Sequence, residues 1–568
     1  MRGGMMRGEA GRLTPWIVMP VLTVALLAGP VLAGLAGALG PAFGWLPSLG
    51  GMGLGLQPWR DLLAMPGLAT GVRLSLTTGL GATVLAFIAA VGIIAVIQGT
   101  AWAGRLRLLL APLLAVPHAA FAVGFLFLAA PSGLIARALS PWATGWDRPP
   151  DLLTVGDPGG IALLAALAVK ETFFLLLVIQ AALAQVPADA TMRIAATLGY
   201  DRRSAWVLLV LPRIYGQIRL PVYAVLAFSC SVIDMALVLG PATPPPLAVQ
   251  VLGWTQDPDL ARRFPAAAGA LLQAGIVAGA ILLWRAGEGA GRMLLRRLAA
   301  SGQRRRGAGL VTGAAILAAC AVTLTIAAIL VLGLWSIAER WRFPDLLPDP
   351  GLRAWMQAAP LLAGPLAMTA GIAALSALLA LVLVVGCLEH EDRAGVSAGR
   401  RALWILYLPL LVPQVTFLFG VQVWLAGIGL SGTAAAVVWM HLLFVLPYTF
   451  LTLADPWRSL DPRYSRVALC LGRSPLAVLL AVKLPLLKRP VLTALAVGFA
   501  VSVALYLPTV QAGAGRVPTI ATEVVSLSAG GDRRLLGAAA LVQALLPLLA
   551  LSAAVLLGRP RFRGQGRT

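Results

Sequence analysis

Four ionisable side chains lie inside long apolar stretches of the sequence. Lys170 and Glu171 share one stretch, Asp234 lies in a second, and His441 lies in a third. A charge at the centre of a membrane helix costs about 2.5–3.5 kcal/mol on insertion scales, so each should have a partner or face a cavity. Glu171 and Asp234 could line a path for a cationic solute. We favour a structural ion pair between helices, with Asp234 as a candidate partner of Lys170. For His441 we favour a satisfied polar contact over a position on the path.

A second set of residues forms a pattern that occurs twice, with every element displaced by 273 residues. Each copy has a glycine that follows a short segment and precedes a proline by thirteen positions. The copies contain Arg193, Ala195, Ala196, Leu198, Gly199 and Pro212, and Arg466, Ala468, Leu471, Gly472 and Pro485. Glycine tolerates the positive φ that ends a helix and proline sets a bend, so each copy predicts two helices around a turn. Such an amphipathic element suits docking into a groove of a cytoplasmic partner. Coincidence in a composition rich in Leu, Ala and Gly is the weaker alternative.

The elements that must position these residues are membrane helices. Of the 568 residues, 59% are hydrophobic and only 12% are charged, with a mean hydropathy of +0.89. So large an excess of apolar side chains requires lipid as a second solvent, which predicts an all-α polytopic membrane protein with about twelve transmembrane helices. The apolar stretches lie at about 15–38, 70–97, 107–130, 159–184, 219–240, 265–285, 309–336, 358–388, 402–426, 433–453, 490–508 and 535–557. Pro117 and Pro413 occupy corresponding places in the third and ninth stretches and predict kinks, either as hinges or as ordinary packing features.

The basic residues predict the orientation of these helices. With twelve spans and the N-terminus inside, 31 of the 44 Lys and Arg residues lie in cytoplasmic segments, as the positive-inside rule requires. Both termini are then cytoplasmic, and the repeated pattern falls in cytoplasmic loops at 187–213 and 460–486. Residues 1–290 and 309–568 form two halves, joined by a basic linker at 291–308. The net charge of +22 does not indicate nucleic-acid binding, because the charges lie in short runs between apolar segments.

The repeated pattern resembles the EAA loop of binding-protein-dependent ABC importer permeases, in which an acidic residue and two alanines precede a glycine, with Leu-Pro thirteen positions after it. Arg193 and Arg466 replace the usual glutamate, and Ile194 and Val467 replace the first alanine. Two fused halves resemble the thiamine and ferric-iron permeases. The run from Pro117-His118 through Pro131-Ser132-Gly133, with Lys170-Glu171-Thr172, is most similar to a thiamine-transport branch.

This resemblance implies two tandem type I importer permease repeats in a bacterial inner membrane. Each loop would seat on one of two ATPase subunits, and a periplasmic binding protein would deliver the substrate, with thiamine, ferric iron or a polyamine as candidates. The chain has no G-x-x-x-x-G-K-[ST] motif, so we expect a transport subunit that does not hydrolyse ATP. No C-x-x-C spacing occurs, and neither a metal nor another cofactor is expected. An ion-driven secondary carrier with twelve spans is the main alternative, and a scaffold protein is a more distant one.

Overall fold

The computed structural model describes residues 15–302, 308–396 and 399–559, and the chain within these ranges is almost entirely helical. The first half contains η1 (Pro15–Ile17), α1 (Val18–Ala42), β1 (Trp45–Leu46), η2 (Pro47–Leu49), β2 (Gly51–Met52), α2 (Gln57–Ala64), α3 (Leu68–Ile97), α4 (Ala101–Ala115), α5 (His118–Ala129), α6 (Leu134–Leu139), α7 (Ile161–Leu183), α8 (Ala188–Thr197), α9 (Arg202–Ala205), the π-helical turn η3 (Trp206–Val210), α10 (Leu211–Ser231), α11 (Asp234–Leu239), α12 (Leu247–Gln256), η4 (Leu260–Arg262) and α13 (Arg263–Ala300). The second half contains α14 (Ala308–Ser336), β3 (Ala338–Arg340), β4 (Asp349–Pro350), α15 (Arg353–Ala394), α16 (Arg400–Leu411), α17 (Gln414–Gly427), α18 (Ala434–Arg458), α19 (Pro462–Cys470), α20 (Pro475–Val478), the π-helical turn η5 (Leu479–Lys483), α21 (Leu484–Leu486), α22 (Lys488–Ala504), α23 (Leu507–Gly513), α24 (Ile520–Ser528) and α25 (Arg533–Leu557).

The membrane-spanning helices follow the predicted apolar stretches closely. Among the described residues, nine helices are long and apolar enough to cross a membrane, or up to eleven if each of two bent helix pairs is counted as one span. This confirms an all-α polytopic protein. The stretch predicted at about 219–240 is not among them, because it forms the end of α10, which carries Arg213 and Arg219 in its first turns, and α11 after a break.

Two further expectations concern the connections. Pro117 separates α4 from α5 and Pro413 separates α16 from α17, and the second of these helix pairs is bent by 93°. The loss of a backbone donor at each proline explains why the helix breaks there. The basic linker predicted at 291–308 is not an extended connection, because α13 continues to Ala300 and α14 begins at Ala308. Residues 303–307 lie outside the described ranges.

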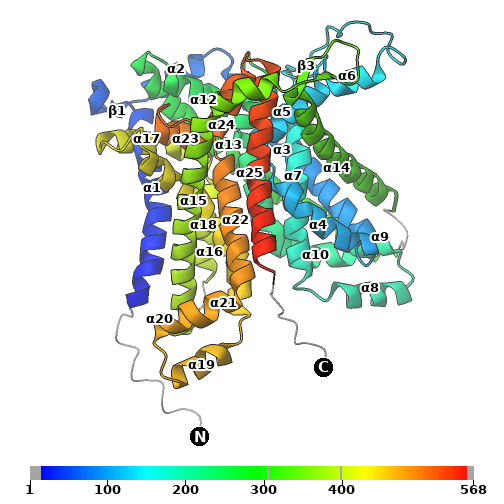
Figure 1. Cartoon of the computed structure of the whole chain (residues 1–568), viewed down its shortest axis with the longest axis vertical. Coiled ribbons are helices and arrows are strands. Elements are labelled where there is room, and N and C mark those ends of the chain that lie inside the picture. The colour runs from blue at the N-terminus through cyan, green and yellow to red at the C-terminus, as the bar shows by residue number, and fades with distance from the viewer. Residues whose placement is uncertain (1–14, 303–307, 397–398, 560–568) are drawn as a thin grey trace.

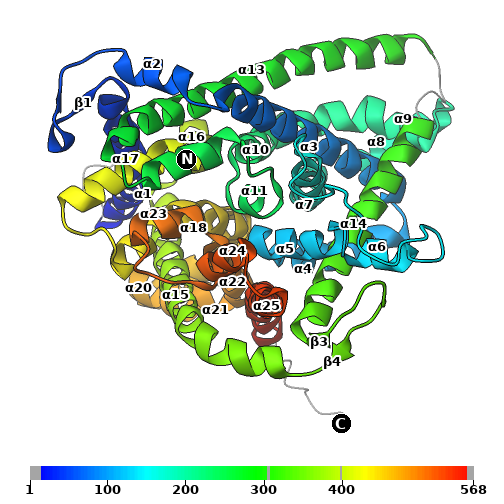
Figure 2. The same ribbon diagram turned by 90° about the horizontal axis from the view of Figure 1, so that it is seen from above.

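The helices form one bundle with short elements at both ends (Figure 1). The two-stranded pairs β1–β2 and β3–β4 lie at the upper end with α2, α6, α12 and α24, whereas α8, α9, α19, α20 and α21 lie at the lower end. The first long helix of each half packs on the other half. Helix α1 packs on α15 and α17, and α14 packs on α3 and α5 (Figure 2). The halves are therefore interlocked and do not sit side by side as separate bodies.

Small residues allow these crossing helices to approach closely, as is usual in membrane bundles. Where α1 crosses α17, a β-carbon added at Gly420 would meet the carbonyl oxygen of Gly34, and one added at Gly34 would meet the carbonyl oxygen of Phe417. Neither clash could be relieved by turning a flexible side chain, because the opposing atoms belong to the backbone. The crossing therefore requires glycine at both positions.

We expect Gly420→Ala to lower the free energy of unfolding by about 1–3 kcal/mol, the usual cost of overpacking a tight contact. Thermal unfolding of the purified protein would measure the change. Gly427→Ala is the matched control, since a β-carbon at this position in the same helix meets nothing within 4 Å. Equal unfolding temperatures for the two variants would show that the α1–α17 crossing can relax.

A buried arginine joins the two halves at the upper end. The Arg137 side chain is only 4% exposed and donates from Nε to the carbonyl oxygen of Ser132 at 2.9 Å. Its Nη1 donates to the carbonyl oxygens of Arg342 and Asp345 at 2.5 and 2.8 Å, and its guanidinium stacks over the ring of Trp341. These contacts hold the segment after α5 against the connection between β3 and β4.

Candidate functional site

The two copies of the repeated pattern have the same backbone conformation. Helix α8 ends just before Gly199 and α19 ends just before Gly472, and both glycines have a φ of +78°. In this left-handed region a β-carbon is strained, which explains the glycine at both positions. The sequence predicted a glycine-permitted turn at each place, and both turns are present.

Hydrogen bonds around the two glycines also match one for one. The N–H of Gly199 donates to the carbonyl oxygen of Ala196 at 3.0 Å, and the N–H of the next residue donates to that of Ala195 at 3.0 Å. The N–H of Gly472 donates to the carbonyl oxygen of Leu469 at 2.9 Å, and the N–H of the next residue donates to that of Ala468 at 3.1 Å. Both are Schellman caps, which satisfy carbonyl groups at a helix C-terminus.

The correspondence continues beyond the turn. Asp201 accepts hydrogen bonds from backbone N–H groups as the N-cap of α9, and Ser474 does the same for α20. A π-helical turn follows in both copies, η3 in the first and η5 in the second, again displaced by 273 residues. Pro212 and Pro485 are each the second residue of the helix that comes next. The first loop thus leads directly into α10, whereas in the second copy a bend of 83° separates the helical segment that ends at Leu486 from α22.

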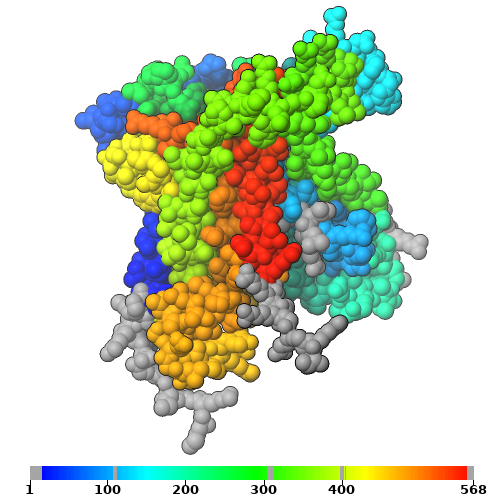
Figure 3. Space-filling model, viewed as in Figure 1, coloured from blue at the N-terminus to red at the C-terminus, as the bar shows by residue number. Residues whose placement is uncertain are grey.

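Both loops lie at the lower end of the bundle (Figure 3), and each exposes apolar side chains there. Ile194 and Leu198 are 63% and 56% exposed in the first loop, and the corresponding Val467 and Leu471 are 59% and 77% exposed in the second. We call these four residues the apolar loop patches. Exposed apolar groups of this size, repeated at equivalent positions, are typical of a surface that binds a partner.

The other predicted loop residues fall into an exposed group and a buried group. The side chains of Arg193, Arg466 and Ala196 are exposed, as are the rings of both prolines. Ala195 and Ala468 instead face inward, at 1% and 9% exposure. An inward-facing alanine keeps each short helix close to the bundle and leaves its apolar patch outward.

Charged residues that the motif did not include anchor the second loop. Lys483, the last residue of η5, pairs with Glu389 at 2.6 Å and with Asp392 at 2.7 Å. The indole N–H of Trp457 also donates to Asp392, at 3.0 Å, and Arg393 pairs with Glu389 at 2.8 Å. These acidic residues lie near the end of α15, where a run of charges directly follows an apolar stretch in the sequence. That run of charges is the sequence signal from which this anchor of the second loop could have been predicted.

The first loop is anchored differently. The indole N–H of Trp206 in η3 donates to the side-chain oxygen of Gln98 at the end of α3. Farther along α10, Glu288 of α13 accepts hydrogen bonds from Tyr215 and Tyr223 at 2.9 and 2.8 Å and pairs with Arg219 at 3.2 Å. Both loops are therefore fixed to long helices, although by different chemical groups.

The structure corrects the predicted partner of Lys170. Lys170 is 2% exposed, and its ammonium group donates to the carbonyl oxygens of Leu113 and Leu114, both at 3.2 Å. The proline at position 117 has no N–H to offer the carbonyl of Leu113 four residues earlier, so the lysine satisfies a group that the kink leaves free. The predicted pairing of Lys170 with Asp234 is wrong.

The two intramembrane carboxylates lie close together. Glu171 of α7 forms a contact of 3.1 Å with Nε2 of His118, the first residue of α5. Asp234, the first residue of α11, accepts a hydrogen bond from the N–H of Met235 at 2.9 Å, and α11 packs on both α5 and α7. The sequence analysis named His118 only as part of the Pro117-His118 motif and did not predict its contact with Glu171. We call His118, Glu171 and Asp234 the acidic centre.

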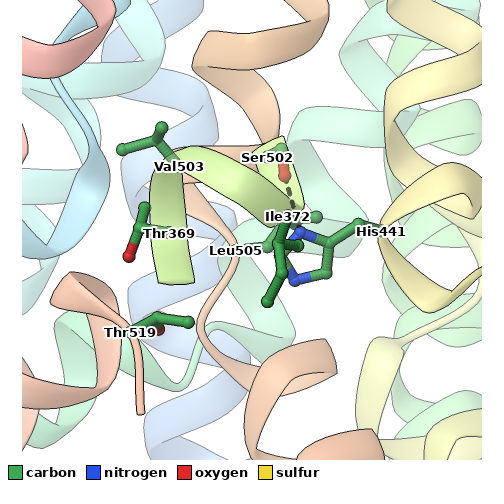
Figure 4. A pocket seen from close by; sticks show the side chains of 7 residues that line it. All are labelled: Thr369, Ile372, His441, Ser502, Val503, Leu505 and Thr519. Carbon is green, nitrogen blue, oxygen red and sulfur yellow. Dashed lines mark hydrogen bonds between the residues drawn. The ribbon is translucent and has the colours of Figure 1, made fainter. Parts of the chain in front are cut away.

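His441 is separate from the acidic centre and belongs to the second half. Its ring nitrogens lie 2.7 Å from Oγ of Ser502 and 2.9 Å from Oγ1 of Thr509. Thr369 and Ile372 line the same pocket, which leaves no room for a water molecule (Figure 4). His441 thus connects α18 to the broken helix formed by α22 and α23 and is fully engaged there.

Comparison with known proteins shows a relative that is similar over most of the chain. No family model matches the chain. The chain is 34% identical, over 511 residues, to the inner membrane ABC transporter permease protein YnjC of Escherichia coli strain K12, and the alignment covers 89% of this chain and 91% of that protein. An alignment of this length extends across both halves of the chain.

Proposed function

The chain belongs to the permease subunits of ABC transporters, and on this premise we propose that it is the membrane subunit of a binding-protein-dependent importer. It is a multi-pass protein of the inner membrane, which agrees with its apolar helices. Residues 1–290 and 309–568 act as its two permease repeats. This assignment takes the place of the ion-driven carrier that the sequence left open.

The observation that carries the proposal is the pair of matched loops. In our proposal, the loops at 187–213 and 460–486 each dock on one of two ATPase subunits. Support comes from their equal backbone geometry, their common position at the lower end and their exposed apolar patches. An amphipathic helix that inserts into a groove of a partner uses apolar anchors of this kind. ATP hydrolysis belongs to the partner subunits, and the loops transmit the resulting movement to the helices that follow.

The lower end is then cytoplasmic, together with both termini. Support comes from the distribution of Lys and Arg between the predicted loops. The upper end would meet a periplasmic binding protein. Apolar side chains are exposed at this upper end, including Leu54 at 80%, Trp142 at 77% and Leu153 at 72%. Such residues suit contact with a protein partner.

We place the translocation path along the acidic centre, between the halves. Thiamine or a related small solute is the substrate that we propose, because the carboxylates favour a cation and because the resemblance of the sequence is to a thiamine-transport branch. Ferric iron and polyamines are the other cationic candidates. The binding protein would do much of the selection before the substrate reaches the membrane.

Reconstitution tests the proposed function. Liposomes that contain the chain with its ATPase subunits, ATP and binding protein should accumulate thiamine, whereas liposomes with the chain alone should not. Uptake by the chain alone, driven by an ion gradient, would contradict the importer assignment. Uptake of ferric iron or a polyamine in place of thiamine would retain the importer and change only its substrate.

A further inference from the structure

Helix α13 is longer than a membrane crossing requires. It contains 38 residues, Arg263–Ala300, which at 1.5 Å per residue extend about 57 Å, whereas about 20 residues cross the hydrocarbon core of a bilayer. Seen from above, the helix runs lengthwise past the edge of the bundle, on the side where α8 and α9 lie (Figure 2). Its last turns therefore reach beyond the apolar interior of the membrane. We call residues 284–300 the α13 extension.

The α13 extension carries positive charge that its own acidic residue does not balance. Arg292, Arg296 and Arg297 are exposed, and none of the three forms an ion pair with another residue in the part of the chain that the structure describes. Nε of Arg292 donates to the backbone carbonyl oxygen of Glu288 at 3.3 Å, a contact that leaves its charge unpaired. Glu288 is the one acidic residue in the sequence of α13, and its buried carboxylate is directed to Arg219 and two tyrosines of α10.

The three arginines line one open cleft of about 350 Å³. Residues four apart on a helix lie one above the other, so Arg292 and Arg296 form one row of the cleft and Gly289, Met293 and Arg297 form the other. Guanidinium groups bind phosphate through paired N–H donors and are suited to it by their planar shape. Three of them around one cleft without a carboxylate among the lining residues provide a place for a phosphate group.

Apolar side chains beside these arginines indicate a lipid and not a free phosphate. Met293, within the cleft, and Leu294 are both 57% exposed. Leu282, in the membrane-crossing part of the helix, is 67% exposed and lies on nearly the same face as Met293, because the eleven positions between them make about three turns. The lipid-facing row of α13 thus continues into the extension. A helix with basic and apolar residues arranged in this way lies in the membrane interface, with its apolar side toward the acyl chains.

We propose that Arg292, Arg296 and Arg297, with Met293 between them, bind the phosphate of an anionic phospholipid such as phosphatidylglycerol at the cytoplasmic leaflet. Helix α13 also packs on η3, through which the first loop enters the bundle, so the bound lipid would lie on the helix that supports this connection. The continuous apolar row favours a lipid over the ATPase subunits, which positive charge alone would also suit. The inference goes beyond the proposed function and takes from it only the cytoplasmic position of the lower end.

Lipid binding to the purified chain tests the site. The full-length chain in detergent would be titrated with phosphatidylglycerol and with phosphatidylcholine of equal chain length, and bound lipid would be measured by native mass spectrometry. We expect phosphatidylglycerol to bind at least about tenfold more tightly. A chain with Arg292→Gln, Arg296→Gln and Arg297→Gln should bind it about a hundredfold more weakly, since each basic residue near anionic lipid contributes about fivefold. Met293→Gln keeps every charge and should weaken binding by about fivefold.

The matched control removes three exposed positive charges from the lower end of the second half, as Arg473→Gln, Lys488→Gln and Arg489→Gln. It should bind phosphatidylglycerol like the wild type. Glycerol 1-phosphate at the same concentration as the lipid should not displace it, because that anion lacks acyl chains. The inference is overturned if the two triple variants bind phosphatidylglycerol equally, if the wild type does not distinguish the two lipids, or if glycerol 1-phosphate displaces the lipid.

Co-purification with the ATPase subunits separates this inference from the proposed function. The triple arginine variant of the α13 extension should lose lipid and keep its ATPase. Loss of the ATPase with unchanged binding of phosphatidylglycerol would overturn the lipid site and assign the three arginines to the partner protein. A wild-type chain that binds phosphatidylglycerol but associates with no ATPase would contradict the importer and support the lipid site.

Discussion

A chain that carries both Leu198→Asp and Leu471→Asp is expected to lose ATP-driven uptake while it folds and inserts like the wild type. The two leucines are 56% and 77% exposed, so their replacement removes little packing within the chain. In the proposed complex each one is covered by an ATPase subunit, and an aspartate would bury an unpaired charge there, which is unfavourable by several kcal/mol. Association with the ATPase should weaken by at least about a hundredfold, equivalent to roughly 2.7 kcal/mol. Co-purification and uptake by proteoliposomes would measure the two effects.

The control places the same charges on equally exposed leucines at the opposite end. Leu54→Asp with Leu153→Asp changes residues that are 80% and 72% exposed. That variant should retain its ATPase, whatever its effect on a binding protein. Normal ATPase association by the Leu198→Asp, Leu471→Asp chain would show that the apolar loop patches are not the docking surfaces. Each single variant should retain one of two contacts and therefore part of the association.

The turns of the two loops could be predicted from the sequence because short-range chemistry determines them. Gly199 and Gly472 adopt positive φ and close the same pair of hydrogen bonds, and the prolines that follow begin the next helix. The apolar stretches likewise predicted most spans, since their lengths match a bilayer. Local composition is enough for features of this kind.

The partners of the buried charges could not be predicted in the same way. Lys170 donates to carbonyl oxygens, a group that every residue carries, and only the kink at Pro117 makes two of them available. Glu171 contacts His118 across 53 positions of sequence. Both contacts depend on how α4, α5 and α7 pack. A list of ionisable residues cannot distinguish a lysine that meets a carboxylate from one that meets a helix end.

Helix α10 shows a related limit of prediction from the sequence. Its first turns contain Arg219 and Tyr215, so composition alone places its beginning late, at about residue 219. In the structure, Glu288 of α13 contacts both side chains and allows α10 to start at Leu211, directly after the first loop. The polar residues thus form part of the connection between the first loop, for which we propose a docking role, and the bundle. A rigid connection of this kind is what a movement transmitted from an ATPase requires.

The anchoring of the second loop leads to the last prediction. Lys483→Met should lower the free energy of unfolding by about 3 kcal/mol, near the lower end of the 3–5 kcal/mol expected when one member of a buried ion pair is removed. Lys483 is 5% exposed and Glu389 is 3% exposed, so water solvates the carboxylate of Glu389 poorly when the lysine is replaced. The effect stays at the lower end because Arg393 still pairs with Glu389 and Trp457 still donates to Asp392. Thermal unfolding and protease cleavage within residues 460–486 would report the loss.

Two comparisons make the measurement specific. Lys488→Met removes an exposed lysine five residues farther along and should change the unfolding temperature little, as surface substitutions usually do. A second chain that combines Lys483→Met with Glu389→Gln should recover part of the stability, because Arg393 then faces one carboxylate, Asp392, instead of two. If Lys483→Met unfolds at the same temperature as Lys488→Met, the charges near the end of α15 do not hold the second loop. In that case apolar contacts would be what fixes η5 to the bundle.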